Sequence, residues 1–128
     1  FAAVLQIAGA TVPVQAYHDT GFTLQDPLAG RRVVLVQYPP LRSRLPAPLR
    51  AYLDSWFASG TAPPPGLRVQ FVPCAAVTGH CLLPAVPAVL CRGQRRVPGL
   101  LAAFCAPDAP TGAWTLLLGD DVAEEVGV

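Results

Sequence analysis

Residues 46–59, PAPLRAYLDSWFAS, carry the clearest secondary-structure signal in the chain, and the predicted fold class depends on it. The large side chains in it recur at i, i+3, i+4, i+7 and i+8, which places them on one face of an α-helix. These side chains are Leu49, Tyr52, Leu53, Trp56 and Phe57. Pro46 and Pro48 are tolerated only in a first helical turn, and Gly60 supplies the left-handed residue that ends many helices. The stretch therefore predicts one amphipathic helix, with Trp56 and Phe57 in the core.

Short strands are expected before this helix. Residues 31–38, RRVVLVQY, form the strongest one because β-branched residues dominate it, and the prolines at 39 and 40 are expected to end it. His18-Asp19-Thr20-Gly21 is a turn signal. The other strands expected before the helix lie at 1–8, 11–17 and 22–25.

More strands are expected after the helix. Residues 66–73 alternate apolar and polar side chains, which predicts a half-buried strand. Pro84 and Pro87 restrict residues 74–87 to short edge pieces. The remaining expectations are strands at 88–91 and 114–118, a strand or a helical turn at 97–105, a loop at 108–112, and a short helix in the acidic tail from Asp120.

The order of these elements predicts the fold class. Strand, strand, strand, helix, strand, strand is the plan of the OB-fold, a five-stranded Greek-key barrel. We therefore expect a mainly β protein, an OB-fold-like five-stranded barrel with one α-helix, at about 46–59, between the third and fourth strands. The length of 128 residues fits a single domain, 1–128. Because the chain starts Phe-Ala-Ala-Val without methionine, we expect this domain to be excised from a larger multidomain protein.

Composition excludes some classes of function. The apolar runs are far shorter than the 18 or more residues that a membrane span needs, and the formal net charge of +1 excludes a strongly basic surface for nucleic acid. The chain has no Lys, Asn or Met, and all nine of its cationic residues are Arg. This bias follows GC-rich codons, so the use of Arg in place of Lys is not itself a sign of bidentate recognition.

The cysteines at 74, 81, 91 and 105 leave two interpretations open. A domain of this length and apolar content does not need disulfides, and reduced Cys is commonly buried as a small hydrophobic residue. An even number of cysteines also fits two disulfides. A zinc site is not expected, because structural zinc sites use ligands paired two to four residues apart and no such pair is present.

The sequence shows no arrangement of catalytic residues. Neither His18 nor His80 has a Ser or Cys that sequence alone identifies as its nucleophile partner. We interpret His18-Asp19 as a solvated turn and the acidic pairs of the tail as a solvated surface. The expectation is therefore a protein that is not an enzyme and uses no cofactor or metal.

Arginine residues form the most notable charged feature. Arg92, Arg95 and Arg96 cluster in one predicted turn, where they are expected either to be solvated or to contact the phosphates of a nucleic acid or a protein partner. Arg68 and Tyr17 are further candidates for such a surface, because they lie on predicted strands near the face that OB-folds use for binding.

Several segments resemble the large subunit of the CST telomere maintenance complex, the conserved telomere maintenance component, which is a string of OB-folds. The resemblance covers the second half of the chain better than the first. It is carried by the segments PGLRVQF at 65–71, AVLC at 88–91, FC at 104–105, GAWTLLL at 112–118 and DVAEEV at 121–126.

This resemblance implies a non-enzymatic scaffold domain in the nucleus, at the telomeres of chromosomes. That complex binds single-stranded telomeric DNA and recruits DNA polymerase alpha–primase in DNA replication. The implied partners are the other subunits of the CST complex and that polymerase, with single-stranded DNA contacted through the parent protein, and with this domain used chiefly for protein and interdomain contacts. The alternative hypothesis is an extracellular or viral surface domain with two disulfides, from a GC-rich genome.

Overall fold

The computed structural model describes residues 1–76, 79–106 and 114–128. Within these ranges the chain forms strands β1 (Ala2–Ile7), β2 (Ala10–His18), β3 (Val33–Gln37), β4 (Gln70–Ala76), β5 (Gly79–Arg92), β6 (Arg95–Cys105) and β7 (Leu116–Leu118). The helices are α1 (Tyr38–Leu41), the 3-10 turn η1 (Arg42–Arg44), α2 (Ala47–Ser59) and α3 (Asp120–Glu125). No helix in the described part of the chain is both long and apolar enough to span a bilayer.

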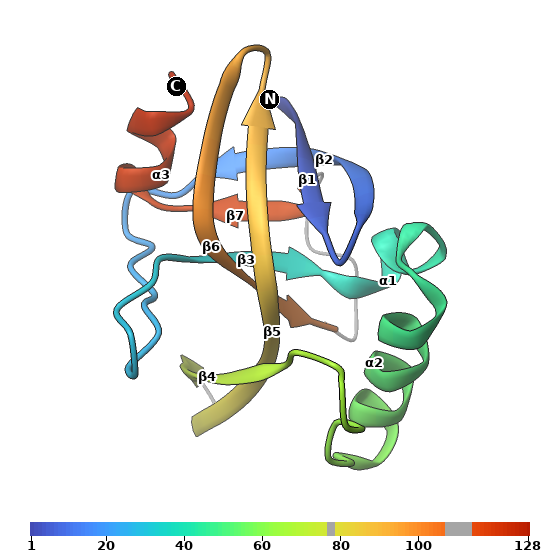
Figure 1. The fold of residues 1–128 in the computed structure, drawn as a ribbon. Coiled ribbons are helices and arrows are strands. Elements are labelled where there is room, and N and C mark those ends of the chain that lie inside the picture. The colour runs from blue at the N-terminus through green and yellow to red at the C-terminus, as the bar shows by residue number, and fades with distance from the viewer. Residues whose placement is uncertain (77–78, 107–113) are drawn as a thin grey trace.

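The strands form one mixed sheet that closes into a barrel (Figure 1). The hydrogen-bonded order is β1-β2-β7-β3-β6-β5-β4, and a further antiparallel pairing of β1 with β5 joins the ends of the first six strands. Strand β5 can close the barrel because it is 14 residues long. Its first half pairs with β4 and its second half, at 88–91, pairs with β1. Strand β4 is left outside the closed barrel as an edge strand.

The expected fold class is confirmed. The protein is mainly β, its barrel is OB-like, and the long helix α2 lies between the third and fourth strands in chain order. Six strands close the barrel where five were expected. Strand β7, which was expected at 114–118, has only three residues and lies between β2, to which it is parallel, and β3, to which it is antiparallel.

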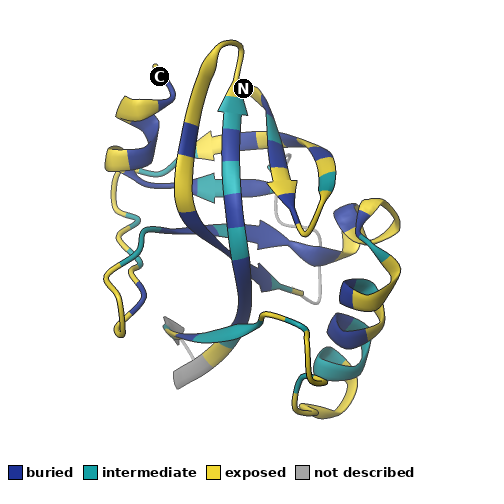
Figure 2. Cartoon of the chain, viewed as in Figure 1, coloured by how far each residue is buried: buried dark blue, intermediate teal, exposed yellow. Residues whose placement is uncertain are grey.

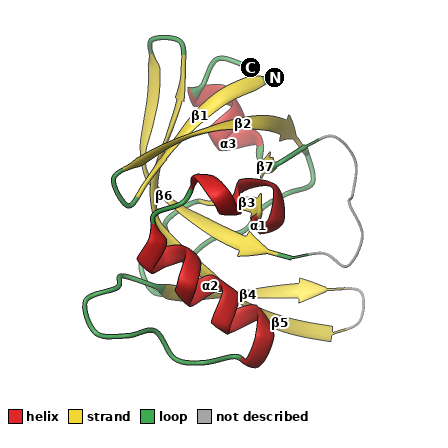
Figure 3. Cartoon of the chain, turned by 90° about the vertical axis from the view of Figure 1, so that its right-hand side faces the viewer, coloured by secondary structure: helices red, strands yellow, loops and turns green. Residues whose placement is uncertain are grey.

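Helix α2 follows its sequence signals closely. It begins after Pro46 and ends at Gly60, which adopts the left-handed conformation at φ 68°. Leu49, Tyr52 and Leu53 are buried on the face that Figure 2 shows turned toward the barrel. Figure 3 shows the helix running along one side of the barrel.

The two aromatic residues on α2 lie where the helix meets the barrel. Trp56 and Phe57 are half-buried and pack against the core, as expected. Trp56 lies 4.6 Å from Phe71 between ring centroids, and Phe57 stacks on Tyr38 at 5.5 Å. These contacts connect α2 both to β4 and to the end of β3.

A polar network fixes α2 to the segment before it. Arg42 donates to both carboxylate oxygens of Asp54, with its shortest contact at 2.6 Å, and the Tyr38 hydroxyl donates to Asp54 Oδ1, also at 2.6 Å. The Arg42 guanidinium and then the Tyr38 hydroxyl lower the pKa of Asp54 to about 2. Burial, followed by the neighbouring carboxylate, raises the pKa of Tyr38. The carboxylate is therefore the form of Asp54 that the fold stabilises.

Four expectations about local structure were wrong. Residues 22–25 form no strand but contribute one isolated bridge, Gln25 to Arg32. Tyr38 opens helix α1, because Pro39 and Pro40 occupy its first turn, where a missing N–H costs nothing. Strand β4 starts only at Gln70, and residues 74–87 belong largely to the long hairpin of β4 and β5.

The loop expected at 108–112 lies outside the described residues.

The buried apolar side chains form two clusters. The larger one fills the barrel and the interface with α2. The smaller one, Val33, Val72, Ala85, Leu101 and Ala103, lies among β3, β4, β5 and β6, and the partly buried Leu24, Leu35 and Leu83 pack against it. The exposed apolar surface here therefore belongs to the covering leucines and not to the cluster itself.

Candidate active site

The turn at Asp19, Thr20 and Gly21 places a carboxylate at the carboxyl end of β2. The Asp19 N–H donates to the Leu118 carbonyl on β7 at 3.0 Å, which continues the pairing of β2 with β7. The Phe22 N–H donates back to the Asp19 carbonyl at 3.0 Å, and the Gly21 N–H donates to Asp19 Oδ1 at 3.0 Å. Asp19 is half-buried and Thr20 is exposed. The backbone therefore holds this carboxylate in one position while leaving it accessible.

Gly119 packs against the far side of the same turn. A Cβ atom at this position would lie far inside van der Waals contact with the carbonyl oxygen of Phe22. Gly119 is the N-cap residue of α3, in extended conformation. The close approach of the two backbones therefore requires glycine and fixes the distance between the turn and α3.

A small cavity opens between the segment after the turn and the start of α3. Its volume is about 160 Å³. It is lined by residues 22–25, Arg32, Val33 and residues 119–122. At its rim, His18 Nε2 lies 2.6 Å from Asp120 Oδ1, and Arg32 Nη1 donates to Glu125 Oε1 at 2.5 Å. The Arg32 guanidinium lowers the pKa of Glu125. These two ion pairs attach the loop after β2 to α3.

Apolar side chains lie on the other side of this loop. Leu24, Leu35 and Leu83 are half-buried over the smaller apolar cluster. Leu28 is 86% exposed and Leu82 is 52% exposed, which is unusual for residues of this size. The loop and the β4–β5 hairpin therefore both present leucines to solvent.

A buried carboxylate anchors the outer part of the loop. Asp26 is 1% exposed, and its Oδ1 accepts the Leu28 N–H at 2.9 Å and a hydrogen bond from Gln70 Nε2. Its Oδ2 lies 3.4 Å from Arg31 Nε, and Arg31 Nη2 donates to Gln70 Oε1 at 2.5 Å. The Leu28 N–H, and then Arg31, outweigh the burial of Asp26 and lower its pKa. This network connects the loop to the first residue of β4.

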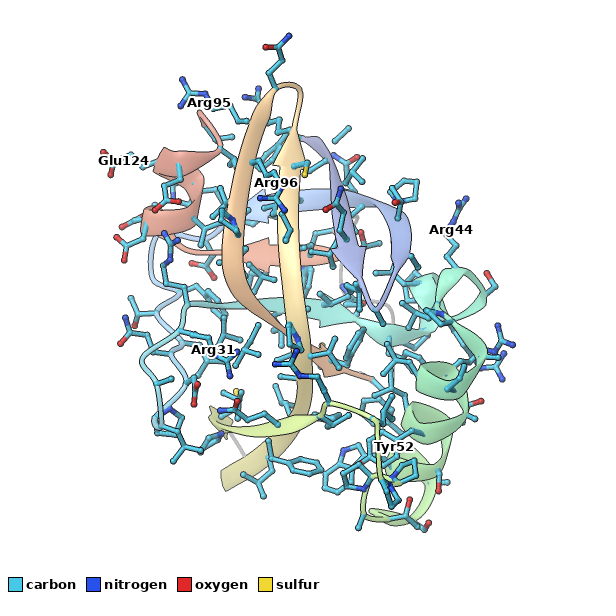
Figure 4. All side chains as sticks on the ribbon, viewed as in Figure 1. Arg31, Arg44, Tyr52, Arg95, Arg96 and Glu124 are labelled. Carbon is cyan, nitrogen blue, oxygen red and sulfur yellow. The ribbon has the colours of Figure 1, made fainter. Side chains whose placement is uncertain are left out.

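The predicted arginine cluster lies elsewhere. Arg92, Arg95 and Arg96 lie at the end of the β5–β6 hairpin, where Arg92 pairs with Arg95 across the strands. Figure 4 shows Arg95 beside α3 and Arg96 in front of the hairpin, well apart from Arg31. Arg92 Nη1 donates to the carbonyls of Val126, at 3.3 Å, and Gly127, at 3.1 Å, beyond the end of α3. One arginine of the cluster therefore has a structural role as a partner for free helix carbonyls.

The other two predicted contact residues are separated from this cluster. Arg68 is exposed and precedes β4, where it lines a second cavity together with Arg31. Tyr17 is 58% exposed on β2, two residues before Asp19. The five predicted residues therefore do not form one surface.

Within the described residues, no group of three or more His, Cys, Asp or Glu side chains is arranged to hold a metal ion. Cys91 is a free thiol, so the alternative with two disulfides, which needs all four cysteines, does not fit. Sequence reasoning interpreted His18-Asp19 as a solvated turn and did not select Asp19 as a candidate site residue, although Asp19 directly follows an alternating strand.

Comparison with protein families gives a match over most of the chain. The family model Peptidase_U4, described as sporulation factor SpoIIGA, matches residues 2–91. No curated protein matches the chain. The matched range runs from β1 into β5 and includes the Asp19 turn, the anchored loop and α2.

This match overturns the interpretation of the chain as part of a telomere complex. The expected partners, namely CST subunits, DNA polymerase alpha–primase and single-stranded DNA, are wrong, and so is the nuclear and telomeric location, because the matching family is a sporulation factor. The resemblance rested on short segments, above all 112–118 and 121–126, and short apolar or alternating segments occur in any barrel whose strands face a core.

The expectation of a non-enzymatic scaffold is also wrong, because the matching family is a family of peptidases. The expectation rested on finding no nucleophile with an adjacent base, no metal-ligand spacing, and carboxylate pairs only in the exposed-looking tail. The match covers more than two thirds of the residues. The chain therefore belongs to the Peptidase_U4 family, that of the sporulation factor SpoIIGA.

Proposed function

We propose that this chain is a peptidase domain in which Asp19 is a catalytic carboxylate, acting in a sporulation process. The observation that carries the proposal is the Asp19 turn inside the family-matched segment, where two backbone hydrogen bonds fix the main chain and the Gly21 N–H donates to the accessible carboxylate. Residues 1–128 are proposed to act as one domain of a larger protein. The family membership supports the reaction class, and the geometry supports the choice of residue.

Other catalytic groups in the described residues are less suited to peptide hydrolysis. Ser55 and Ser59 lie on α2 and bond to Thr61 and to the helix backbone, without a histidine beside them. His18 pairs with Asp120 and not with a hydroxyl or a thiol. A Ser or Cys nucleophile needs an adjacent base that is itself oriented, and this arrangement is missing from the described part of the chain. A carboxylate mechanism remains.

A carboxylate mechanism needs a second carboxylate. Aspartic peptidases use two Asp side chains that share one proton. Most other described carboxylates already have side-chain partners: Asp26 with Arg31, Asp54 with Arg42, Asp120 with His18 and Glu125 with Arg32. We therefore propose that the second carboxylate is Asp19 of a second copy of the chain, related by a two-fold axis.

The proposed reaction is general acid–base hydrolysis of a peptide bond. The ionised carboxylate of the pair removes a proton from a water molecule, whose oxygen attacks the carbonyl carbon, while the protonated partner gives its proton to the carbonyl oxygen. When the tetrahedral intermediate collapses, the C–N bond breaks, the amine nitrogen takes up the proton held by the pair, and one hydroxyl of the intermediate returns its proton to the pair as the new carboxyl group forms. Atoms and charges balance without a metal or cofactor.

The leucines around the loop support a substrate with apolar side chains. Leu24, Leu35 and Leu83 are half-buried over the smaller cluster, and Leu28 and Leu82 are exposed. An extended peptide places alternate side chains on one side, so apolar residues two apart can contact this surface together. We expect cleavage next to apolar residues.

The test is Asp19→Asn, which keeps the size and the hydrogen-bonding shape of the side chain but removes the carboxylate. A mixture of synthetic peptides with randomised sequence is incubated with the chain, and new termini are identified by mass spectrometry. We expect cleavage by the parent chain and a loss of at least about 10²-fold in Asp19→Asn, the lower end for removal of a general acid–base group.

Glu124→Gln is the matched control for the loss of a carboxylate. Glu124 is exposed on α3, and no ion pair involves it in the described residues. This variant should cleave like the parent. Equal cleavage by Asp19→Asn, with a circular dichroism spectrum like that of the parent, would show that Asp19 is not catalytic.

A further inference from the structure

A second cavity lies at the junction of the anchored loop, the start of β4 and the β5–β6 sheet. Its volume is about 250 Å³. It is lined by Arg31, Arg68, Val69, Gln70, Pro87 and Leu101. Figure 4 shows Arg31 in this region, between the loop and the barrel. This cavity and the one beside α3 have no lining residue in common, although the same loop borders both.

The positive charge in this cavity is only half neutralised. Asp26 is the carboxylate that contacts Arg31. Asp26 is buried and already accepts hydrogen bonds from Leu28, Gln70 and Arg31. Arg31 uses Nε for Asp26 and Nη2 for Gln70, so its remaining amino group has no partner among the described residues. Arg68 forms no ion pair or hydrogen bond within the described residues. Two guanidinium groups thus face one carboxylate.

Arg31 is held in place before any ligand arrives. It contacts Asp26 in its own loop and Gln70, which lies 39 residues further along the chain. A fixed guanidinium loses little conformational entropy when it binds a carboxylate, and its planar fork fits the two oxygens. Arg68 is exposed and free to close over the same group.

The remaining walls are apolar. Val69, Pro87 and Leu101 line the cavity beside the arginines, and Leu101 is 1% exposed. The volume of about 250 Å³ is below the roughly 300 Å³ at which small-molecule pockets usually begin. The cavity therefore has the size of one amino-acid side chain, with charge at one part and apolar surface at another.

We propose that this cavity binds the side chain of a glutamate or aspartate in an extended polypeptide. The carboxylate contacts Arg31 and Arg68, and the methylene groups lie on Val69, Pro87 and Leu101. A carboxylate fits better than a nucleic acid because the site offers two cations in a small cavity and the net charge of the whole chain is only +1. The proposal concerns binding and stands whether or not Asp19 cleaves peptide bonds.

The experiment is a titration followed by ¹⁵N–¹H NMR, which detects weak binding. The probe is acetyl-Ala-Val-Glu-Val-Ala-amide, and its partner probe carries Gln in place of Glu. Both are added to the Asp19→Asn chain so that the peptide stays intact. We expect the Glu probe to shift the signals of Val69, Leu101 and Arg31 Nε, and the Gln probe to bind about tenfold more weakly, since hydrogen bonds to charged groups are the stronger ones.

Arg68→Gln is the decisive variant, because Arg68 is exposed and its loss leaves the Asp26 network intact. It should weaken the Glu probe about tenfold. Arg96→Gln is the matched control, since Arg96 is also exposed but lies near the turn of the β5–β6 hairpin, away from the cavity. This variant should leave the affinity unchanged. Each of three results would overturn the proposal: equal binding of the two probes, unchanged affinity in Arg68→Gln, or inorganic phosphate displacing the Glu probe at equal concentration.

Discussion

At the scale of single residues, Gly119 shows how packing between distant segments shapes the candidate site. Its backbone touches that of Phe22 so closely that a Cβ has no room. Gly119→Ala must push α3 away from the Asp19 turn or distort both. We expect a loss of about 1–3 kcal/mol in the free energy of unfolding, the usual cost of overpacking, measured by urea denaturation.

Gly21→Ala is the matched control for this prediction. A Cβ at Gly21 would lie 3.6 Å from Asp19 Oδ1, which is ordinary van der Waals contact. This variant should stay within about 0.5 kcal/mol of the parent. If Gly119→Ala were as stable as Gly21→Ala, the close packing of α3 on the turn would not exist in solution.

Sequence reasoning predicted the backbone at Asp19 but not its role. The turn was expected from Asp and Gly, and the structure contains it. What makes Asp19 a candidate catalytic residue is its contact with Leu118 and the proximity of Gly119, about 100 residues further along the chain. No local pattern encodes these contacts. The same holds for Asp26, whose burial depends on Gln70.

At the scale of elements, α2 is held mainly by its apolar face. Leu53 is fully buried, at 0% exposure, and is among the largest such side chains. Leu53→Ala removes these contacts and leaves a cavity between helix and barrel. We expect a loss of about 2–5 kcal/mol in urea denaturation. Ala58→Ser, on the exposed side of the same helix, is the control and should change the free energy of unfolding by less than about 0.5 kcal/mol. Equal stability of Leu53→Ala and Ala58→Ser would contradict the packing of α2 on the barrel.

The elements differ in how well the sequence predicts them. Helix α2 was predicted nearly to the residue, because its periodicity, its prolines and Gly60 are all local signals. Strand β5 was not, because Pro84 and Pro87 indicate breaks. It forms nonetheless, since β4 and β1 share one of its edges and β6 pairs with the other, so tertiary pairing outweighs local propensity.

At the scale of the whole molecule, stability should fall in acid. Folding lowers the pKa of Asp26, Asp54 and Glu125, the second of them to about 2. Between the unfolded pKa, about 3.9 for Asp, and the folded one, the unfolded chain binds more protons. The stabilisation from these carboxylates is therefore complete at a pH above their pKa in the unfolded chain. It is lost as the pH falls through their pKa in the folded chain. We expect the urea midpoint to be steady from about pH 7 to 5 and to decrease from about pH 4 to 2.

Asp54→Asn should remove part of this dependence, so that its urea midpoint decreases less between about pH 4 and 2 than that of the parent. Glu124→Gln should keep the parent's full decrease, since Glu124 has no cationic partner in the described residues. A midpoint independent of pH over this range in the parent chain would mean that these carboxylates are not paired in solution.

The central claim is that one Asp19 from each of two copies forms the catalytic pair. The most direct test mixes the parent chain with Asp19→Asn at fixed total concentration, allows the copies to exchange, and measures peptide cleavage by mass spectrometry. If both copies must supply the carboxylate, activity follows the square of the parent fraction and an equal mixture retains about a quarter of the activity. Activity in proportion to the parent fraction, about half in an equal mixture, would contradict the claim, because each copy would then act alone.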